Sequence, residues 1–149
     1  MKKLIITSAI LIIIGIIIGL KIPSAKMSLE QVFQSGNTYY FIQENVYTNK
    51  EILEENTKNI SSKIIENENN KYYVYLAITS DISNAKKIKQ IYEQKGYNIY
   101  IKERHISNEE FHANLSQFDI LLKNTDSEKE ILTIVEVILA NYEEIIKTS

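Results

Sequence analysis

Cysteine is absent from this chain of 149 residues, which excludes disulfides, thiolate metal sites and cysteine nucleophiles. Only 2 histidines are present, too few for a histidine-rich metal centre. With 1 proline and 4 glycines, the sequence contains neither GxGxxG nor GxxxxGKS/T, so the usual nucleotide-phosphate loops are excluded. The net charge of −2 lacks the basic excess typical of nucleic-acid-binding proteins. We therefore expect no cofactor and no nucleic-acid partner.

An apolar run without charge extends from Leu4 to Leu20, directly after Lys2 and Lys3. As a helix it is about 25 Å long, the short end of a membrane span. We expect residues 1–22 to be an uncleaved single-pass anchor whose N-terminus is cytoplasmic, with the rest of the chain outside the cytoplasmic membrane. The alternative is a cleaved signal peptide, for which the residues around Ser24 match a cleavage site poorly.

Gly15 and Gly19 form a GxxxG step within this apolar run. Small residues at this spacing allow two membrane helices to approach closely, so they are a candidate homodimer contact. The other interpretation is that both are chance small residues in an apolar segment. Residues 23–38 then form a linker to the remaining chain.

Alternating and helical patterns follow one another along residues 39–104. Strands are predicted over residues 39–47, 63–66, 72–79 and 97–103. Thr48 is expected to begin a helix that runs to about residue 60, and Ser80 to begin a second helix that ends at Gly96. The order strand, helix, strand, strand, helix, strand predicts an α+β, ferredoxin-like domain: a four-stranded antiparallel sheet with both helices on one face.

The C-terminal part, residues 105–149, has a different pattern. Capping boxes begin at Ser107 and Thr125, and each precedes apolar residues at spacings of 4, 3 and 4. Two helices with narrow apolar seams predict an αα-hairpin. It is acidic, with 3 basic and 9 acidic residues from His105 to Ser149. The hairpin either folds back on the sheet domain or offers a surface to a partner.

Residues 39–104 resemble the SPOR domain family. The segment Ile42-Gln43-Glu44-Asn45-Val46-Tyr47, followed by Asn49-Lys50-Glu51, is similar to the family's first strand and helix start. Val74-Tyr75-Leu76-Ala77-Ile78-Thr79 and Lys95-Gly96-Tyr97 are similar to its second half. The chain departs from the family where Asn45 and Ala77 replace glycines, Thr79 replaces an aromatic residue, and Glu44 replaces an apolar one.

The resemblance implies a non-catalytic module that binds peptidoglycan glycan strands at the division or sporulation septum of a low-GC Gram-positive bacterium. The departures favour an alternative: a degenerate SPOR-like domain that acts as a protein–protein interaction module in a sporulation or division membrane complex. A sensor for a small molecule is a third class, for which no convergent polar pocket can be named from the sequence.

If the helices cover one sheet face, alternation sends a set of aromatic and amide side chains to the other face. The candidate peptidoglycan-binding residues are Phe41, Gln43, Tyr73, Tyr75 and Tyr100. Sugar rings pack their C–H faces on aromatic rings, and amides bind sugar hydroxyls. Two other interpretations stay open. The C-terminal hairpin or a partner covers this face, or the tyrosines serve only sheet stability.

No set of residues predicts catalysis or metal binding. His105 and His112 are seven positions apart, and Ser107 is expected to cap a helix between them, so they are not a preformed pair. Glu109 and Glu110 beside His112 do not form HExxH and suit the first turn of a helix. We therefore predict that the protein is not an enzyme.

Overall fold

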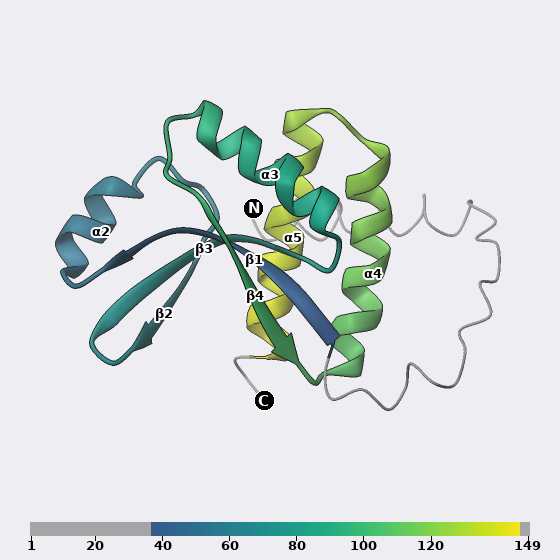
Figure 1. Ribbon diagram of the computed structural model, residues 1–149, viewed down its shortest axis with the longest axis horizontal. Helices are drawn as coiled ribbons and strands as arrows, with labels where there is room; N and C mark the ends of the chain where they lie inside the picture. The colour runs from purple at the N-terminus through teal and green to yellow at the C-terminus, as the bar shows by residue number, and fades with distance from the viewer. Residues whose placement is uncertain (1–36, 147–149) are drawn as a thin grey trace, which may run out of the picture. The chain divides into compact units, whose positions relative to one another are not determined.

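The structure is a computed structural model that describes residues 37–146 (Figure 1). The expected anchor, its glycine step and nearly all of the expected linker lie outside the described residues. No helix among residues 37–146 is long and apolar enough to cross a membrane. The elements in chain order are β1 (Asn37–Tyr47), α2 (Lys50–Asn56), β2 (Ile64–Glu68), β3 (Lys71–Thr79), α3 (Ile82–Gln94), β4 (Tyr100–Ile106), α4 (Glu109–Asn124) and α5 (Glu128–Ile145).

The four strands form one antiparallel sheet in the order β2-β3-β1-β4, which confirms the predicted α+β class with a four-stranded antiparallel sheet. β1 is central and pairs with both β3 and β4. Its register with β3 shifts on both sides of Gln43, so that Glu44 and Asn45 fall inside an irregular stretch. Such bulges bend a strand and redirect its side chains locally.

A tight turn joins β2 to β3, where the sequence predicts a polar hairpin loop. Asn69 and Asn70 both have positive φ, 53° and 60°. Asparagine tolerates this left-handed conformation better than other residues with a side chain, and two consecutive such residues match the twist of a hairpin. The asparagine-rich segment therefore sets the register between β2 and β3.

Every helix begins one or two residues later than the sequence predicts. The observed N-caps are Asn49, Asp81, Asn108 and Ser127. The expected caps at Thr48, Ser80, Ser107 and Thr125 are wrong. Asparagine and aspartate compete well with serine and threonine for the free N–H groups of a first turn. Two of the expected caps use their hydroxyls elsewhere, Ser80 on Asp119 and Thr125 on Glu130.

Two other boundaries differ from the prediction. α2 is only seven residues long and ends at Asn56, and the Thr57 hydroxyl donates to the Leu53 carbonyl at this end of the helix. β4 begins at Tyr100 rather than at residue 97, because Gly96 and Tyr97 bond back to the last turn of α3. Gly96 has φ of 90°, a conformation that favours glycine at the end of a helix.

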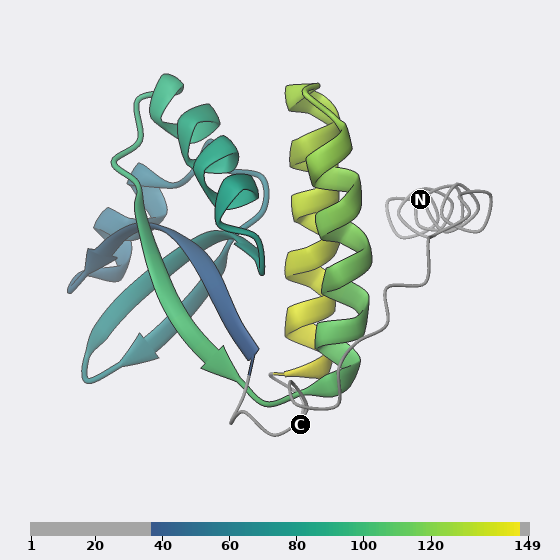
Figure 2. The same ribbon diagram turned by 45° about the vertical axis from the view of Figure 1, so that its right-hand side comes forward.

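Helices α4 and α5 lie side by side and antiparallel next to the sheet (Figures 1 and 2). Seven of their apolar side chains are at most 2% exposed: Phe111, Leu115, Leu122, Ile131, Val135, Ile138 and Tyr142. They belong to the same hydrophobic core as residues of β1, β3 and α3. Residues Gly36–Ser149 form one compact unit, so the packing has no boundary at residue 104 between a sheet domain and a separate hairpin. This unit contains the whole described core, and we therefore expect it to fold on its own.

Candidate functional site

Strand pairing brings the predicted binding residues onto one sheet face. Gln43 lies opposite Tyr75 on β3 and opposite Tyr100 on β4. Directly opposed residues in antiparallel strands point to the same side. The rings of Phe41 and Tyr75 are 5.1 Å apart at 76°, so Phe41 belongs to this face as well. We call the surface of Phe41, Gln43, Tyr73, Tyr75 and Tyr100 the tyrosine face.

The hairpin covers most of the tyrosine face. Phe41 is 0% exposed and Tyr75 2%, and Gln43 is also buried. The Phe41 ring lies 5.5 Å from the ring of Tyr142 in α5, in an edge-on arrangement at 80°. The interpretation of an open face is therefore wrong for Phe41, Gln43 and Tyr75, and coverage by the hairpin is the alternative that the structure supports. The physical reason is that the apolar seam of α4 and α5 needs a partner surface, and aromatic residues provide one.

One edge of the tyrosine face stays accessible, beyond the reach of the hairpin. Tyr100 is 51% exposed, and its hydroxyl accepts a hydrogen bond of 2.8 Å from the Asn98 amide. Tyr73 is half-buried, and the Lys102 ammonium lies 4.7 Å from the centre of its ring. We call Tyr73, Asn98, Tyr100 and Lys102 the β4 strip. It is the part of the predicted site that a ligand can reach.

A polar cluster holds the other end of the tyrosine face against α5. The Arg104 guanidinium pairs with Glu66 at 2.9 Å and lies 4.5 Å from the centre of the Phe41 ring. The Tyr142 hydroxyl donates to the other carboxylate oxygen of Glu66, at 3.0 Å. Burial, followed by the nearby charge of Glu66, raises the pKa of Tyr142 to about 12. Tyr142 therefore stays a neutral donor, and the cluster ties β2, β4 and α5 together.

Asp119 connects α4 to the junction of β3 and α3. Its carboxylate accepts hydrogen bonds from the Thr79 hydroxyl, from the backbone N–H and hydroxyl of Ser80 at 2.8 and 2.6 Å, and from the Asn84 amide at 3.3 Å. Asp119 is 8% exposed, which is unusual for an acidic side chain. The sequence analysis missed this residue. The available signal was its spacing, four after Leu115 and three before Leu122, which places a carboxylate on the apolar seam.

A second buried carboxylate lies at the bulge of β1. Glu44 is 5% exposed, and the Tyr47 hydroxyl lies 2.8 and 3.0 Å from its two oxygens. Burial raises the pKa of the Glu44 carboxyl, and the hydrogen bond from Tyr47 lowers it by less. The pKa of Tyr47 rises to about 12 because of burial and the adjacent carboxylate. The pair fixes the irregular stretch of β1.

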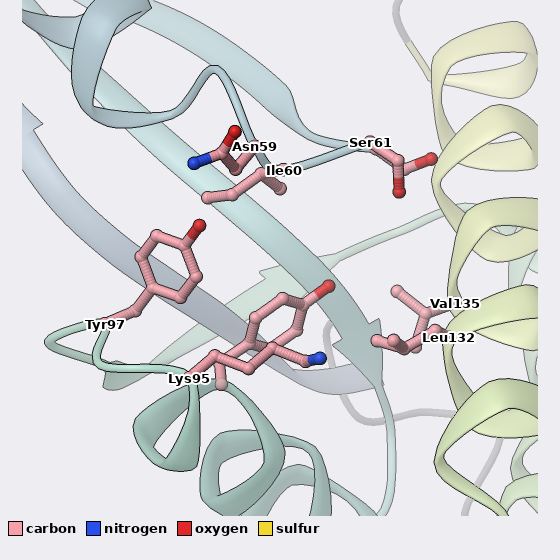
Figure 3. Close-up of a pocket in the computed structure, with 9 residues that line it drawn as sticks. Asn59, Ile60, Ser61, Lys95, Tyr97, Leu132 and Val135 are labelled. Atoms are coloured by element: carbon pink, nitrogen blue, oxygen red, sulfur yellow. The ribbon is translucent and has the colours of Figure 1, made fainter.

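A cavity of about 370 Å³ lies between the loop before β2, the end of α3 and the first half of α5. Figure 3 shows Asn59, Ile60 and Ser61 on one side, Lys95 and Tyr97 on another, and Leu132 and Val135 on α5. The sequence analysis named no such pocket. Its walls come from three segments far apart in the chain, and no periodicity connects them.

The two histidines do not meet. His105 Nδ1 lies 3.2 Å from the Thr38 hydroxyl, and His112 Nδ1 lies 3.2 Å from the Tyr39 hydroxyl. Across the part of the chain that the structure describes, no group of three or more acidic or histidine side chains is arranged to bind a metal ion.

Comparisons with known proteins add no relatives. No family model, no curated protein and no solved structure matches this chain. The function must therefore be argued from the geometry above.

Proposed function

We propose that this chain is a membrane-anchored, non-catalytic interaction module of the cell envelope that docks another protein of a division or sporulation complex. In this proposal, residues 39–104 are a degenerate SPOR-like unit with α2 and α3 on one sheet face, and the other face is filled by the chain's own hairpin. The observation that carries the proposal is the burial of Phe41 and Tyr75 beneath Tyr142.

The energetics of the hairpin favour protein docking over glycan binding on the full tyrosine face. Burying one large apolar side chain contributes about 1.5–3 kcal/mol. Displacing the seven nearly inaccessible side chains of the hairpin would cost on the order of 10 kcal/mol, as much as the whole stability of a typical domain. A few sugar–aromatic contacts of about 1 kcal/mol each do not offset that cost.

The outer side of the hairpin supplies the docking surface in this proposal. Ile120 is a large apolar side chain that is 42% exposed on α4. Asn114 bonds to Asn141 across the antiparallel helices, so residue 120 lies level with residue 135 of α5, next to the exposed Glu136. Glu130 is also exposed on α5, whereas Glu128 pairs with Lys95 beside the cavity. An exposed apolar side chain with carboxylates on the neighbouring helix suits a basic, partly apolar protein segment.

The test is affinity capture from membranes with the full-length chain. Ile120→Lys removes the apolar contact and repels a basic partner, so we expect the captured partner to be lost. Ile52→Lys is the matched control, because Ile52 is 53% exposed on α2, which lies apart from α4 and α5 (Figures 1 and 2). A partner list that is unchanged by Ile120→Lys would remove the proposal.

The proposed localisation is testable separately. A single-pass anchor over residues 1–22 with a cytoplasmic N-terminus puts Gly36–Ser149 outside the cytoplasmic membrane. A reporter enzyme that is active only outside the cytoplasm, fused after Ser149, is expected to be active. An inactive reporter on a correctly expressed fusion would contradict this topology.

The β4 strip supports a second candidate, residual binding of peptidoglycan glycan strands. Tyr100 offers an exposed ring and Asn98 an amide beside it, while Lys102 covers Tyr73. The test is co-sedimentation of Gly36–Ser149 with cell-wall sacculi, with and without amidase treatment. Binding that is lost in Tyr100→Ala would favour this candidate. No co-sedimentation in either case would remove it.

A further inference from the structure

The cavity beside α5 has the size and the mixed lining of a small-molecule site and is separate from both surfaces discussed above. Its volume of about 370 Å³ falls within the range of ligand pockets, roughly 300–1,000 Å³. Its lining combines apolar side chains from the loop and α5, namely Ile60, Leu132 and Val135, with polar side chains from the loop and the end of α3. Lys95 is the single charged residue in that lining.

Tyr92 supplies a buried polar group with no protein partner. The residue is 6% exposed and lines the cavity, and its hydroxyl makes no hydrogen bond within residues 37–146. Every fully buried polar side-chain atom in this part of the chain does have a partner. The Tyr92 hydroxyl is therefore accessible to solvent, and the residue lines the cavity. Burial raises the pKa of Tyr92 to about 12, so the group it offers is a neutral O–H.

The other polar groups of the lining are also available. The side chains of Asn59, Ser61, Ser62 and Tyr97 make no hydrogen bond among the described residues. The rings of Tyr92 and Tyr97 are 6.2 Å apart at 70°, which gives two inclined aromatic surfaces. The Lys95 ammonium is neutralised by Glu128 at 2.6 Å. The cavity thus offers several donors and acceptors, apolar walls and no unpaired charge.

From this combination we propose that the cavity binds an uncharged, polyhydroxylated ring compound of about monosaccharide size. Several ligand hydroxyls bond to Tyr92, Tyr97, Asn59 and the two serines. The C–H face of the ring packs on the aromatic and aliphatic walls. An anion gains no free cation here, because Lys95 is paired, and a cation gains no free carboxylate, because Glu128 is paired. The inference goes beyond the proposed docking function and does not depend on it.

The test is an NMR titration of Gly36–Ser149 with glucose and myo-inositol as neutral probes, and with glucuronate and glucosamine as charged analogues of glucose. We expect saturable shifts for Tyr97, Leu132 and Val135 signals with the neutral probes, with dissociation constants in the millimolar range. The charged analogues are expected to bind more weakly. No saturable shift at about 50 mM, shifts confined to other residues, or equal binding of a charged analogue would each overturn the proposal.

Two substitutions test whether the Tyr92 hydroxyl contacts the ligand. Tyr92→Phe removes the unpartnered hydroxyl and keeps the ring, so the fold is retained and binding is expected to weaken about three- to tenfold. Tyr100→Phe is the matched control, because that hydroxyl lies outside the cavity, and it is expected to leave binding unchanged. Unchanged affinity in Tyr92→Phe would overturn the assignment. Partner capture is expected to be unaffected by Tyr92→Phe, which keeps the failure of this proposal distinct from the failure of the docking function.

Discussion

Substitution of Phe41 by alanine distinguishes a core residue from a ligand-binding residue. The side chain is fully buried and its ring contacts Tyr75 at 5.1 Å and Tyr142 at 5.5 Å. Truncation of a core phenylalanine to alanine costs about 3–5 kcal/mol. Loss of two edge-on aromatic pairs, each worth about 0.5–1.5 kcal/mol beyond area, places Phe41→Ala in the upper half of this range. We therefore expect a destabilisation of about 4 kcal/mol.

The assay is urea unfolding of Gly36–Ser149, followed by far-UV circular dichroism and by tyrosine fluorescence, with coincident transitions as the check for two-state behaviour. Tyr100→Ala is the matched control, since Tyr100 is 51% exposed on the same sheet face, and it is expected to change the free energy of unfolding by at most about 0.5 kcal/mol. If Phe41→Ala leaves too little folded protein, Phe41→Leu keeps most of the ring volume and gives a smaller loss in the same direction.

A cost for Phe41→Ala below about 1 kcal/mol, similar to that of Tyr100→Ala, would refute the reasoning. It would mean that the hairpin does not cover the tyrosine face in solution. The surface of Phe41, Gln43 and Tyr75, which the sequence predicts to bind glycan, would then be accessible to a ligand.

Three further predictions use the same unfolding assay. Asp119→Ala leaves the backbone N–H and the hydroxyl of Ser80 without their partner and is expected to cost about 2–4 kcal/mol, against almost nothing for the exposed Asp126→Ala; equal effects would contradict the role of Asp119. The raised pKa of Glu44 means that the folded state binds its proton more tightly, so stability falls as pH rises above 4.5; Glu44→Gln should be more stable than the parent at pH 7, with the gap closing toward pH 5. Gly96→Ala puts a side chain at φ of 90° and is expected to cost about 1–2 kcal/mol although open space surrounds it; a neutral effect would argue against that conformation.

Local patterns predicted the strands and their shared face. The alternating pattern predicted that Gln43, Tyr75 and Tyr100 lie on one sheet face. The pairing of β1 with β3 and β4 places them directly opposite one another on that face. Helix starts were located to within one or two residues, because capping depends on a few neighbouring side chains. The choice among adjacent Ser, Thr, Asn and Asp residues was decided by tertiary contacts, as the bond from Ser80 to Asp119 illustrates.

What covers the tyrosine face was not predictable from periodicity. A period of two assigns side chains to the two sides of a strand, and it contains no information on which distant element lies opposite. The contact between Tyr39 and His112 joins residues 73 positions apart, and the bond between Tyr142 and Glu66 joins residues 76 positions apart. The cavity around Tyr92 is long-range in the same way, because loop, α3 and α5 meet only in the folded chain.

The late position of α5 in the chain has a consequence for biogenesis. Tyr142 bonds to Glu66, 76 positions earlier, and packs on Phe41 near the start of β1. The interior therefore cannot close until α5 has been synthesised, because α5 forms one side of the core. Until then, the aromatic side chains that α5 covers are exposed to solvent, and the growing chain is prone to aggregation and proteolysis. Any product that stops short of α5 is expected to be degraded, so folded protein is expected to accumulate only after α5 has been made.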